Sequence, residues 1–352
     1  MALDPKGNAL RLHTQGLLKP RWNDPVEVVR ALGAVQAQDY YGAKWAIGQR
    51  CDANDTAVEE AFNAGRIIRT HLLRPTWHFV VPEDLRWLLR LTGERVRKFN
   101  GTMYRKLGLE GTHFRKANKV LEKLLVGGKA LDRQTISTAL QEAKLDVSDF
   151  RLVHLLMDAE LTGLICSGPR AGKQFTYMLL EERVPGVPER SNDEALIELM
   201  RRYFSTRGPA TVNDFAWWSG LTVSEAKRGL LLLGKELERH GSNERWVMSG
   251  TDAPKPPTNA VHLVPNYDEY AIGFKDRSPF HDASSASRGR ALRHILLHNG
   301  AVIGTWDTPG GKGLELSPFK PLGPAVHKAI AEQERRYRAF LQERVEKGLD
   351  RR

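Results

Sequence analysis

Residues 24–39 read DPVEVVRALGAVQAQD, a capped amphipathic helix that leads into a pair of glutamines. Asp24 offers a side-chain acceptor at the cap and Pro25 stands at the first helical position, a combination typical of a helix start. The apolar residues that follow recur at helical spacing and predict one buried face: Val28, Val29, Leu32 and Val35. We therefore expect a packed helix that presents the glutamines at its end.

Gln36 and Gln38 lie two residues apart, so they cannot share a helix face and can converge only where the chain is extended or turning. An amide offers both a donor and an acceptor, and two of them at one site can hold a water molecule or the edge of a base. The alternative is a pair of solvated residues at a helix C-terminus. The glutamine spacing alone favours that alternative.

Predicted helices followed by a β-hairpin recur three times, the one-dimensional pattern of a winged helix. The first unit, residues 8–91, has helices from residue 25, at 43–48 and at 57–63 and strands at 67–70 and 76–80. The second, residues 112–185, has helices at 117–125, 133–143 and 149–160 and strands at 164–167 and 174–179. The third, residues 193–250, has a capping box from Thr222 to Glu225, a helix at 223–233 and a strand at 246–248. This repeat predicts three tandem domains of one kind.

Residues 251–258 form a linker by composition, and the pattern becomes β-rich after it. Candidate strands lie at 262–264, 295–297, 301–306 and 314–316. Asn299-Gly300 is a strong signal for a hairpin turn, and a charged helix from Pro324 to Glu346 closes the chain. The sequence therefore predicts a mainly α protein with β structure (α+β), whose last domain, residues 258–346, is β-rich.

The composition is that of an ordinary globular protein, and its excess of basic residues suits a polyanionic partner. The chain has 352 residues, 41% hydrophobic and 27% charged, with a formal net charge of +11. Phosphate contacts need Lys and Arg, so this charge suits nucleic acid. Cys51 and Cys166 fit neither a disulfide framework nor a zinc spacing. Without a membrane-spanning run or a signal peptide, we expect a cytoplasmic protein.

No cofactor motif stands in the sequence. Residues 168–173, GPRAGK, are one residue short of a phosphate-binding loop, and Gln174 stands where Ser or Thr would bind magnesium. A basic wing tip is the better interpretation. The histidines do not fall at metal-ligand spacings, and no dinucleotide fingerprint or nucleophile elbow occurs. We expect no metal, no nucleotide and no other cofactor.

Further motifs follow the glutamine pair in a fixed order: Arg74-Pro75-Thr76-Trp77-His78-Phe79-Val80, Leu263-Val264-Pro265-Asn266-Tyr267-Asp268-Glu269-Tyr270, Lys275-Asp276-Arg277 and Val302-Ile303-Gly304-Thr305-Trp306. Each motif alone is weakly specific. The ordered set resembles the winged-helix DNA glycosylases of the AlkZ/YcaQ type, over nearly the whole chain.

This resemblance implies three tandem winged helices plus a C-terminal β domain, curved around DNA. It also implies a monofunctional glycosylase that hydrolyses the N-glycosidic bond of alkylated purines. The family's catalytic motif is Gln-x-Gln in one branch and Gln-x-Asp in the other. Gln36 and Gln38 match the first branch, which is associated with interstrand crosslinks and bulky N7-alkylguanines, so they are the predicted catalytic residues.

The predicted DNA contacts are Arg50, Arg74, Thr76, His78, Arg170, Lys173 and Asn299. In a strand Thr76 and His78 point to one face. The resemblance implies that this polar face is directed toward DNA. The alternative is a wing strand with its polar side in water. The hairpin at Asn299 is a candidate wedge between bases, and the alternative is a barrel turn.

Two neighbouring groups have less specific interpretations. Tyr40, Tyr41 and Trp45 can stack on a base or pack between helices. The acidic pair Asp268 and Glu269 is expected to form a buried polar network that ties the last domain to the rest.

We expect the partner to be double-stranded DNA with alkylated purines, bound by a monomer associated with the nucleoid and not with a membrane. Two other functions are open. Tandem winged helices commonly bind operators, so a non-enzymatic regulator is one alternative. A sensor whose glutamines bind a small ligand is the other.

Overall fold

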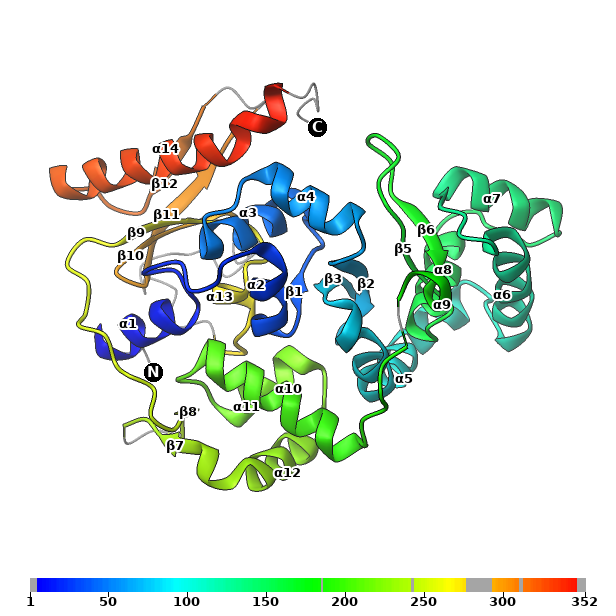
Figure 1. Ribbon diagram of the computed structural model, residues 1–352, viewed down its shortest axis with the longest axis horizontal. Helices are drawn as coiled ribbons and strands as arrows, with labels where there is room; N and C mark the ends of the chain where they lie inside the picture. Colours follow the sequence, from blue (N-terminus) through cyan, green and yellow to red (C-terminus); the bar gives the residue numbers. More distant parts are fainter. Residues whose placement is uncertain (1–4, 185, 242–243, 277–292, 310–312, 347–352) are drawn as a thin grey trace. The chain divides into compact units, whose positions relative to one another are not determined.

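The computed structural model describes residues 5–184, 186–241, 244–276, 293–309 and 313–346. The chain forms two compact units (Figure 1). The first unit takes in residues 1–59, 197–218 and 222–352, and the second takes in residues 60–196 and 219–221.

The first unit begins with helices. These are α1 (Pro5–Thr14), α2 (Pro25–Leu32) and α3 (Tyr40–Cys51), with the two-residue strand β1 (Val35–Gln36) between α2 and α3. Helix α4 (Asp55–Asn63) begins in this unit and ends in the second. Asp24 caps α2, since its side chain accepts from the backbone N–H groups of Val26 and Glu27, as the sequence predicts.

Three helices and a hairpin form the next part of this unit. They are α10 (Asn192–Arg207), whose first residues belong to the second unit, α11 (Val212–Ser219), α12 (Val223–Leu233), the 3-10 turn η1 (Gly234–Glu236), β7 (Leu237–Arg239) and β8 (Trp246–Met248). The predicted capping box at Thr222 is present. The core here is aromatic, with ring centroids 5.2–6.4 Å apart among Tyr203, Phe204, Phe215 and Trp218.

A four-stranded antiparallel sheet of order β12-β11-β10-β9 completes the first unit. Its elements are β9 (Val261–Val264), β10 (Ile295–His298), β11 (Ala301–Asp307) and β12 (Glu315–Pro318), with α13 (Glu269–Ile272) after β9 and α14 (Pro324–Glu346) packed along β9. Trp45 and Trp306 donate indole N–H bonds to the carbonyls of Leu263 and Val264, and both rings contact Tyr337 of α14. The predicted strands and closing helix are confirmed.

The second unit holds a hairpin, a long helix and a small sheet. Its elements are β2 (Ile68–Leu72), β3 (Thr76–Val80), α5 (Pro82–Lys106), α6 (Gly111–Leu125), β4 (Leu131–Asp132), α7 (Arg133–Glu142), α8 (Arg151–Leu161), β5 (Ile165–Ser167), β6 (Thr176–Leu179) and α9 (Leu180–Arg183). Strands β2 and β3 pair antiparallel, and β4, β6 and β5 form a three-stranded sheet in that order. Leucines and isoleucines of α6, α7 and α8 make the core.

Helix α5 has no counterpart among the sequence predictions. It runs for 25 residues through the predicted domain end at residue 91 and across most of the stretch to residue 112. Its buried stripe, which includes Leu85, Leu88, Leu89 and Val96, packs partly on α8. The chain separates into two compact units. This division does not test the four predicted domains, whose boundaries stay predictions.

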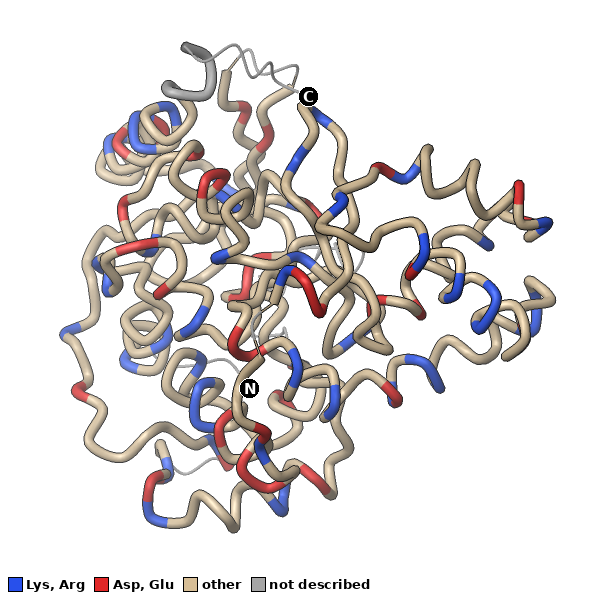
Figure 2. Tube along the Cα trace, turned by 45° about the vertical axis from the view of Figure 1, so that its right-hand side comes forward, with Lys and Arg blue, Asp and Glu red and all other residues tan. Residues whose placement is uncertain are grey.

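The mixed α+β class is confirmed. Lys and Arg are spread over both units and interspersed with Asp and Glu (Figure 2). In the part of the chain that the structure describes, no helix is long and apolar enough to cross a membrane.

Candidate active site

The glutamine pair lies outside the helix that precedes it. Helix α2 ends at Leu32, because Gly33 adopts a left-handed conformation (φ 76°) that glycine tolerates best. Val35, which the apolar spacing assigned to the helix, is therefore in β1. The chain is extended at Gln36 and bends at Gln38, and an extended or turning chain is the condition under which two side chains separated by one residue can converge.

The two glutamines differ in exposure. Gln36 is buried, at 6% exposure, while Gln38 is exposed in the bend before α3. The solvated end of a helix is therefore wrong for Gln36. Next to them, Asp39 caps α3 by accepting from the Gly42 N–H at 3.0 Å. That cap needs glycine, since a Cβ at Gly42 would lie 2.6 Å from the Asp39 carboxylate.

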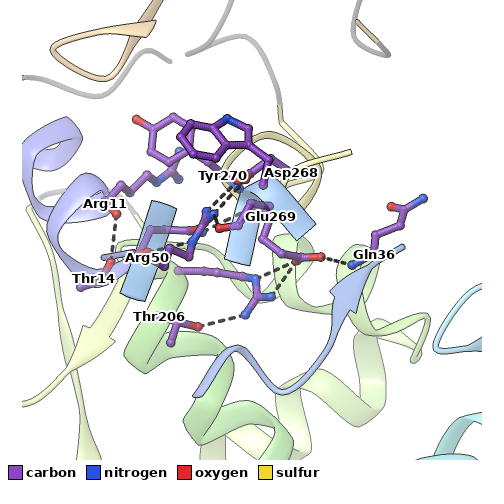
Figure 3. Close-up of polar contacts among 12 residues, drawn as sticks. Arg11, Thr14, Gln36, Arg50, Thr206, Asp268, Glu269 and Tyr270 are labelled. Carbon is purple, nitrogen blue, oxygen red and sulfur yellow. Dashed lines mark hydrogen bonds and ion pairs between the residues drawn. The ribbon is translucent and has the colours of Figure 1, made fainter. Parts of the chain in front are cut away.

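A buried carboxylate holds the backbone at Gln36. Glu269 Oε1 accepts the Gln36 N–H at 2.9 Å. Its Oε2 accepts from Arg207 Nη2 at 2.7 Å and from the Trp218 indole at 2.8 Å. The Gln36 side chain points away from Glu269 (Figure 3), so the carboxylate fixes the backbone and not the amide.

Arg207 adds two more backbone contacts to the same segment. Its Nη1 donates to the Leu32 carbonyl at 2.9 Å and its Nη2 to the Ala34 carbonyl at 3.3 Å. The guanidinium also lies 4.2 Å from the centre of the Trp218 ring. Both members of the ion pair are buried, at 0% and 1% side-chain exposure.

The predicted polar network at the acidic pair is confirmed, and it corrects the role of Arg50. All five guanidinium N–H groups of Arg50 are engaged, with Gln15, with the Ala46 carbonyl and with both oxygens of Asp268. Arg50 is 0% exposed. It is therefore an internal tie of the first unit and not a DNA contact.

A second ion cluster, in which Lys44 and Asp55 are buried and Glu59 is half-buried, lies between α3 and α4. Lys44 Nζ binds Asp55 Oδ2 at 2.8 Å and Glu59 Oε2 at 2.6 Å. The Tyr40 hydroxyl donates to the same Glu59 oxygen at 2.9 Å. Tyr40 and Trp45 are buried and Tyr41 is half-buried, so packing is the better interpretation for the first two.

Three predicted contacts lie on or beside β3 in the second unit. Arg74 and Thr76 are half-buried, whereas His78 is fully buried and its Nδ1 bonds the Thr76 carbonyl at 2.9 Å. His78 is therefore not presented to DNA in this conformation. Arg74 and Thr76 stay predicted contacts.

The basic wing tip between β5 and β6 exposes Lys173. Arg170 is half-buried, and its guanidinium lies 4.4 Å from the centre of the Phe175 ring and bonds the Lys173 carbonyl. Its backbone N–H donates to Asn63 at 2.8 Å. The tip is a braced turn from which Lys173 projects.

Asn299 forms the expected β10–β11 turn with Gly300, at φ 50° and 83°. Its amide accepts from the Ala260 N–H at 2.8 Å and donates to the Thr258 carbonyl. A Cβ on Gly300 would lie 2.9 Å from Asn8 and from the Tyr270 hydroxyl. The turn is thus packed onto its own unit, which favours the barrel turn over a wedge.

The described residues include no group of three or more His, Cys, Asp or Glu side chains that is placed to hold a metal ion. Arg277, the last residue of the third predicted motif, lies outside the described residues. The sequence did not indicate that Arg207 and Glu269 hold Gln36, because no local pattern connects positions so far apart in the chain.

Comparison with known proteins defines the class. The family model for DNA glycosylase AlkZ-like proteins matches residues 29–340, so this chain belongs to the AlkZ-like family of DNA glycosylases. The protein is therefore assigned as an enzyme, and the assignment favours a glycosylase over the regulator and the ligand sensor.

A relative from Streptomyces sahachiroi, the interstrand DNA cross-link repair glycosylase, is 24% identical over 351 residues. The alignment covers 92% of this chain and 93% of that protein. The solved structure of Streptomyces sahachiroi DNA glycosylase AlkZ matches with a TM-score of 0.74 at 20% identity and covers 96% of each chain. This likeness supports the fold.

Proposed function

We propose that this DNA glycosylase hydrolyses the N-glycosidic bond of N7-alkylated purines, with Gln36 and Gln38 as its catalytic residues. The observation that carries the proposal is the Gln-x-Gln segment itself, which leaves β1 and bends before α3, with the Gln36 N–H bonded to the buried Glu269 carboxylate at 2.9 Å. Arg74, Thr76, Arg170 and Lys173 are proposed to contact the DNA.

The chemistry suits weak catalysts. Alkylation at N7 leaves guanine cationic, so the base is already a good leaving group and needs no strong acid. The enzyme then has to hold a water molecule beneath C1′ and stabilise an oxocarbenium-like sugar. Two neutral amides can orient that water, although an amide is not a strong general base. Cationic adducts should therefore be cleaved and neutral lesions spared.

Interstrand crosslinks and bulky adducts are included in the proposed substrates. The Streptomyces sahachiroi relative carries crosslink repair in its name. A crosslinked base cannot rotate out of the duplex, so the enzyme would have to act on the base in place. We further propose that it acts as a monomer on double-stranded DNA of the nucleoid.

The test is single-turnover excision from a duplex with one N7-methylguanine, scored as free base and abasic sites. Gln36→Ala and Gln38→Ala should each lower the rate about 100-fold, with DNA affinity nearly unchanged. A positioned water matters in the transition state more than in binding. Gln141→Ala, at an exposed glutamine of α7, is the matched control and should be neutral.

Full activity in both variants would show that the catalytic assignment is wrong. An equal loss of DNA affinity in both would show that the glutamines bind DNA instead of water. A duplex with one N7–N7 guanine crosslink, tested in parallel, separates excision of small adducts from crosslink unhooking.

A further inference from the structure

We propose that Arg207 and Glu269 are positioning residues, which set the rate of base release by fixing the backbone that carries Gln36 and Gln38. The inference rests on the proposed catalytic role of these glutamines. It assigns a function to a buried ion pair that bonds the backbone of the glutamine segment.

The contacts fall on every second residue. Arg207 donates to the carbonyls of Leu32 and Ala34, and Glu269 accepts from the N–H of Gln36. Leu32 is the last residue of α2, Ala34 precedes β1 and Gln36 ends β1. The ion pair thus bonds three alternate residues of the backbone between the end of the helix and the first glutamine.

The contact with Leu32 also explains how the helix end is kept in place. The last carbonyls of a helix have no intrahelical donor, and a cation there is favoured by the helix dipole. Leu32 is the last residue of α2, and Arg207 supplies both the donor and the charge. One guanidinium therefore fixes the end of α2 and the start of the glutamine segment together.

The pair is built for rigidity. Trp218 and Arg207 both donate to Glu269 Oε2. The centre of the Trp218 ring lies 4.2 Å from the guanidinium carbon of Arg207. A buried ion pair contributes little net stability compared with apolar side chains of the same size. Its planar, multiply bonded geometry does hold a backbone in one position. Positioning is therefore a better account of this pair than stability.

The neighbouring pair Arg50 and Asp268 provides a matched control. Arg50 Nη2 and Asp268 Oδ1 are also 2.7 Å apart, and the two side chains are 1% and 0% exposed. Its acidic member directly precedes Glu269 in the chain, and Figure 3 shows both carboxylates in one cluster. All five Arg50 donors bond elsewhere than on residues 32–38.

The experiment compares Arg207→Lys with Arg50→Lys. Lysine keeps the charge but loses the planar fork that reaches two carbonyls and a carboxylate. The melting temperature, the affinity for the N7-methylguanine duplex and the single-turnover rate are measured below the melting range of both variants. Both should lose stability to a similar degree. Arg207→Lys should lower the rate about 10- to 100-fold with affinity nearly unchanged, and Arg50→Lys should leave most of the rate.

Equal rate losses in the two variants, or a full rate in Arg207→Lys, would overturn the proposal. If either lysine variant fails to fold, Trp218→Phe decides, because it keeps a ring and removes only the bond to Glu269. Its control is Trp306→Phe, which removes the indole bond to the Val264 carbonyl. Trp218→Phe should slow excision about 3- to 10-fold, and an equal effect of Trp306→Phe would contradict the inference.

The glutamine variants separate the two proposals. Full activity in Gln36→Ala and Gln38→Ala would remove the proposed catalytic site, whatever the arginine variants do. Loss of activity in the glutamine variants with a full rate in Arg207→Lys and Trp218→Phe would reject only the positioning role.

Discussion

His262 is a buried imidazole on β9, and neither ring nitrogen has a hydrogen-bond partner among the described residues. Burial lowers the pKa of His262 to about 4, and the positive charges of Arg336 and Arg50 add to this effect. The nearby carboxylate of Asp268 acts in the opposite direction. The side chain is therefore neutral in the folded protein at any pH near neutrality.

This pKa predicts an acid-sensitive stability. As the pH falls below about 6.5, the unfolded chain takes up the proton first, while folded His262 stays neutral until about pH 4. The folded state should lose about 3 kcal/mol from this group by pH 4. His262→Leu should remove that part of the pH dependence, measured by urea unfolding between pH 7 and pH 4. If the free energy of unfolding falls with pH by the same amount in the variant and in the parent protein, the prediction is contradicted.

Among the helices, α3 is joined to α4 by Lys44, whose Nζ binds the carboxylates of Asp55 and Glu59. Removing a single member of a buried ion cluster leaves the other charges uncompensated. Lys44→Met should therefore lower the free energy of unfolding by about 3–5 kcal/mol. Urea unfolding is the measurement, and a loss below about 1 kcal/mol would mean that water already screens the cluster. Adding Asp55→Asn to the variant should recover part of the loss.

Local signals predicted most of the elements. Residues 223–233, 76–80 and the Pro324–Glu346 helix have the predicted bounds, because caps, alternation and turn residues act over a few positions. Gly33 shows the limit of periodicity. The apolar spacing continued to Val35, but the helix ended where glycine turned left-handed.

What the sequence did not predict depends on contacts between distant positions. Glu269 lies 233 residues from Gln36, and its contact is to the backbone, so no motif at Gln36 records it. Arg50 and His78 were predicted DNA contacts but are buried, and burial is set by tertiary packing. The family resemblance located the glutamines, while the means of holding them appeared only in the fold.

At the scale of the whole molecule, the net charge of +11 predicts how the enzyme finds DNA. Phosphate contacts release counterions and carry no base information, so affinity should fall steeply with salt and depend little on sequence. Lys173 is an exposed cation at a braced wing tip, and Arg74 is half-buried in the β2–β3 turn.

Lys173→Ala and Arg74→Ala should each reduce the slope of log affinity against log salt by about 1, with base excision at saturating enzyme unchanged. The control is Arg338→Ala, since Arg338 is exposed on α14 but already paired with Glu334. Binding to an undamaged duplex of mixed sequence, measured from about 50 to 200 mM salt, gives the slopes. Unchanged slopes in both variants would place the phosphate contacts on other cations, and a strong preference for one undamaged sequence would contradict electrostatic binding as the basis of DNA affinity.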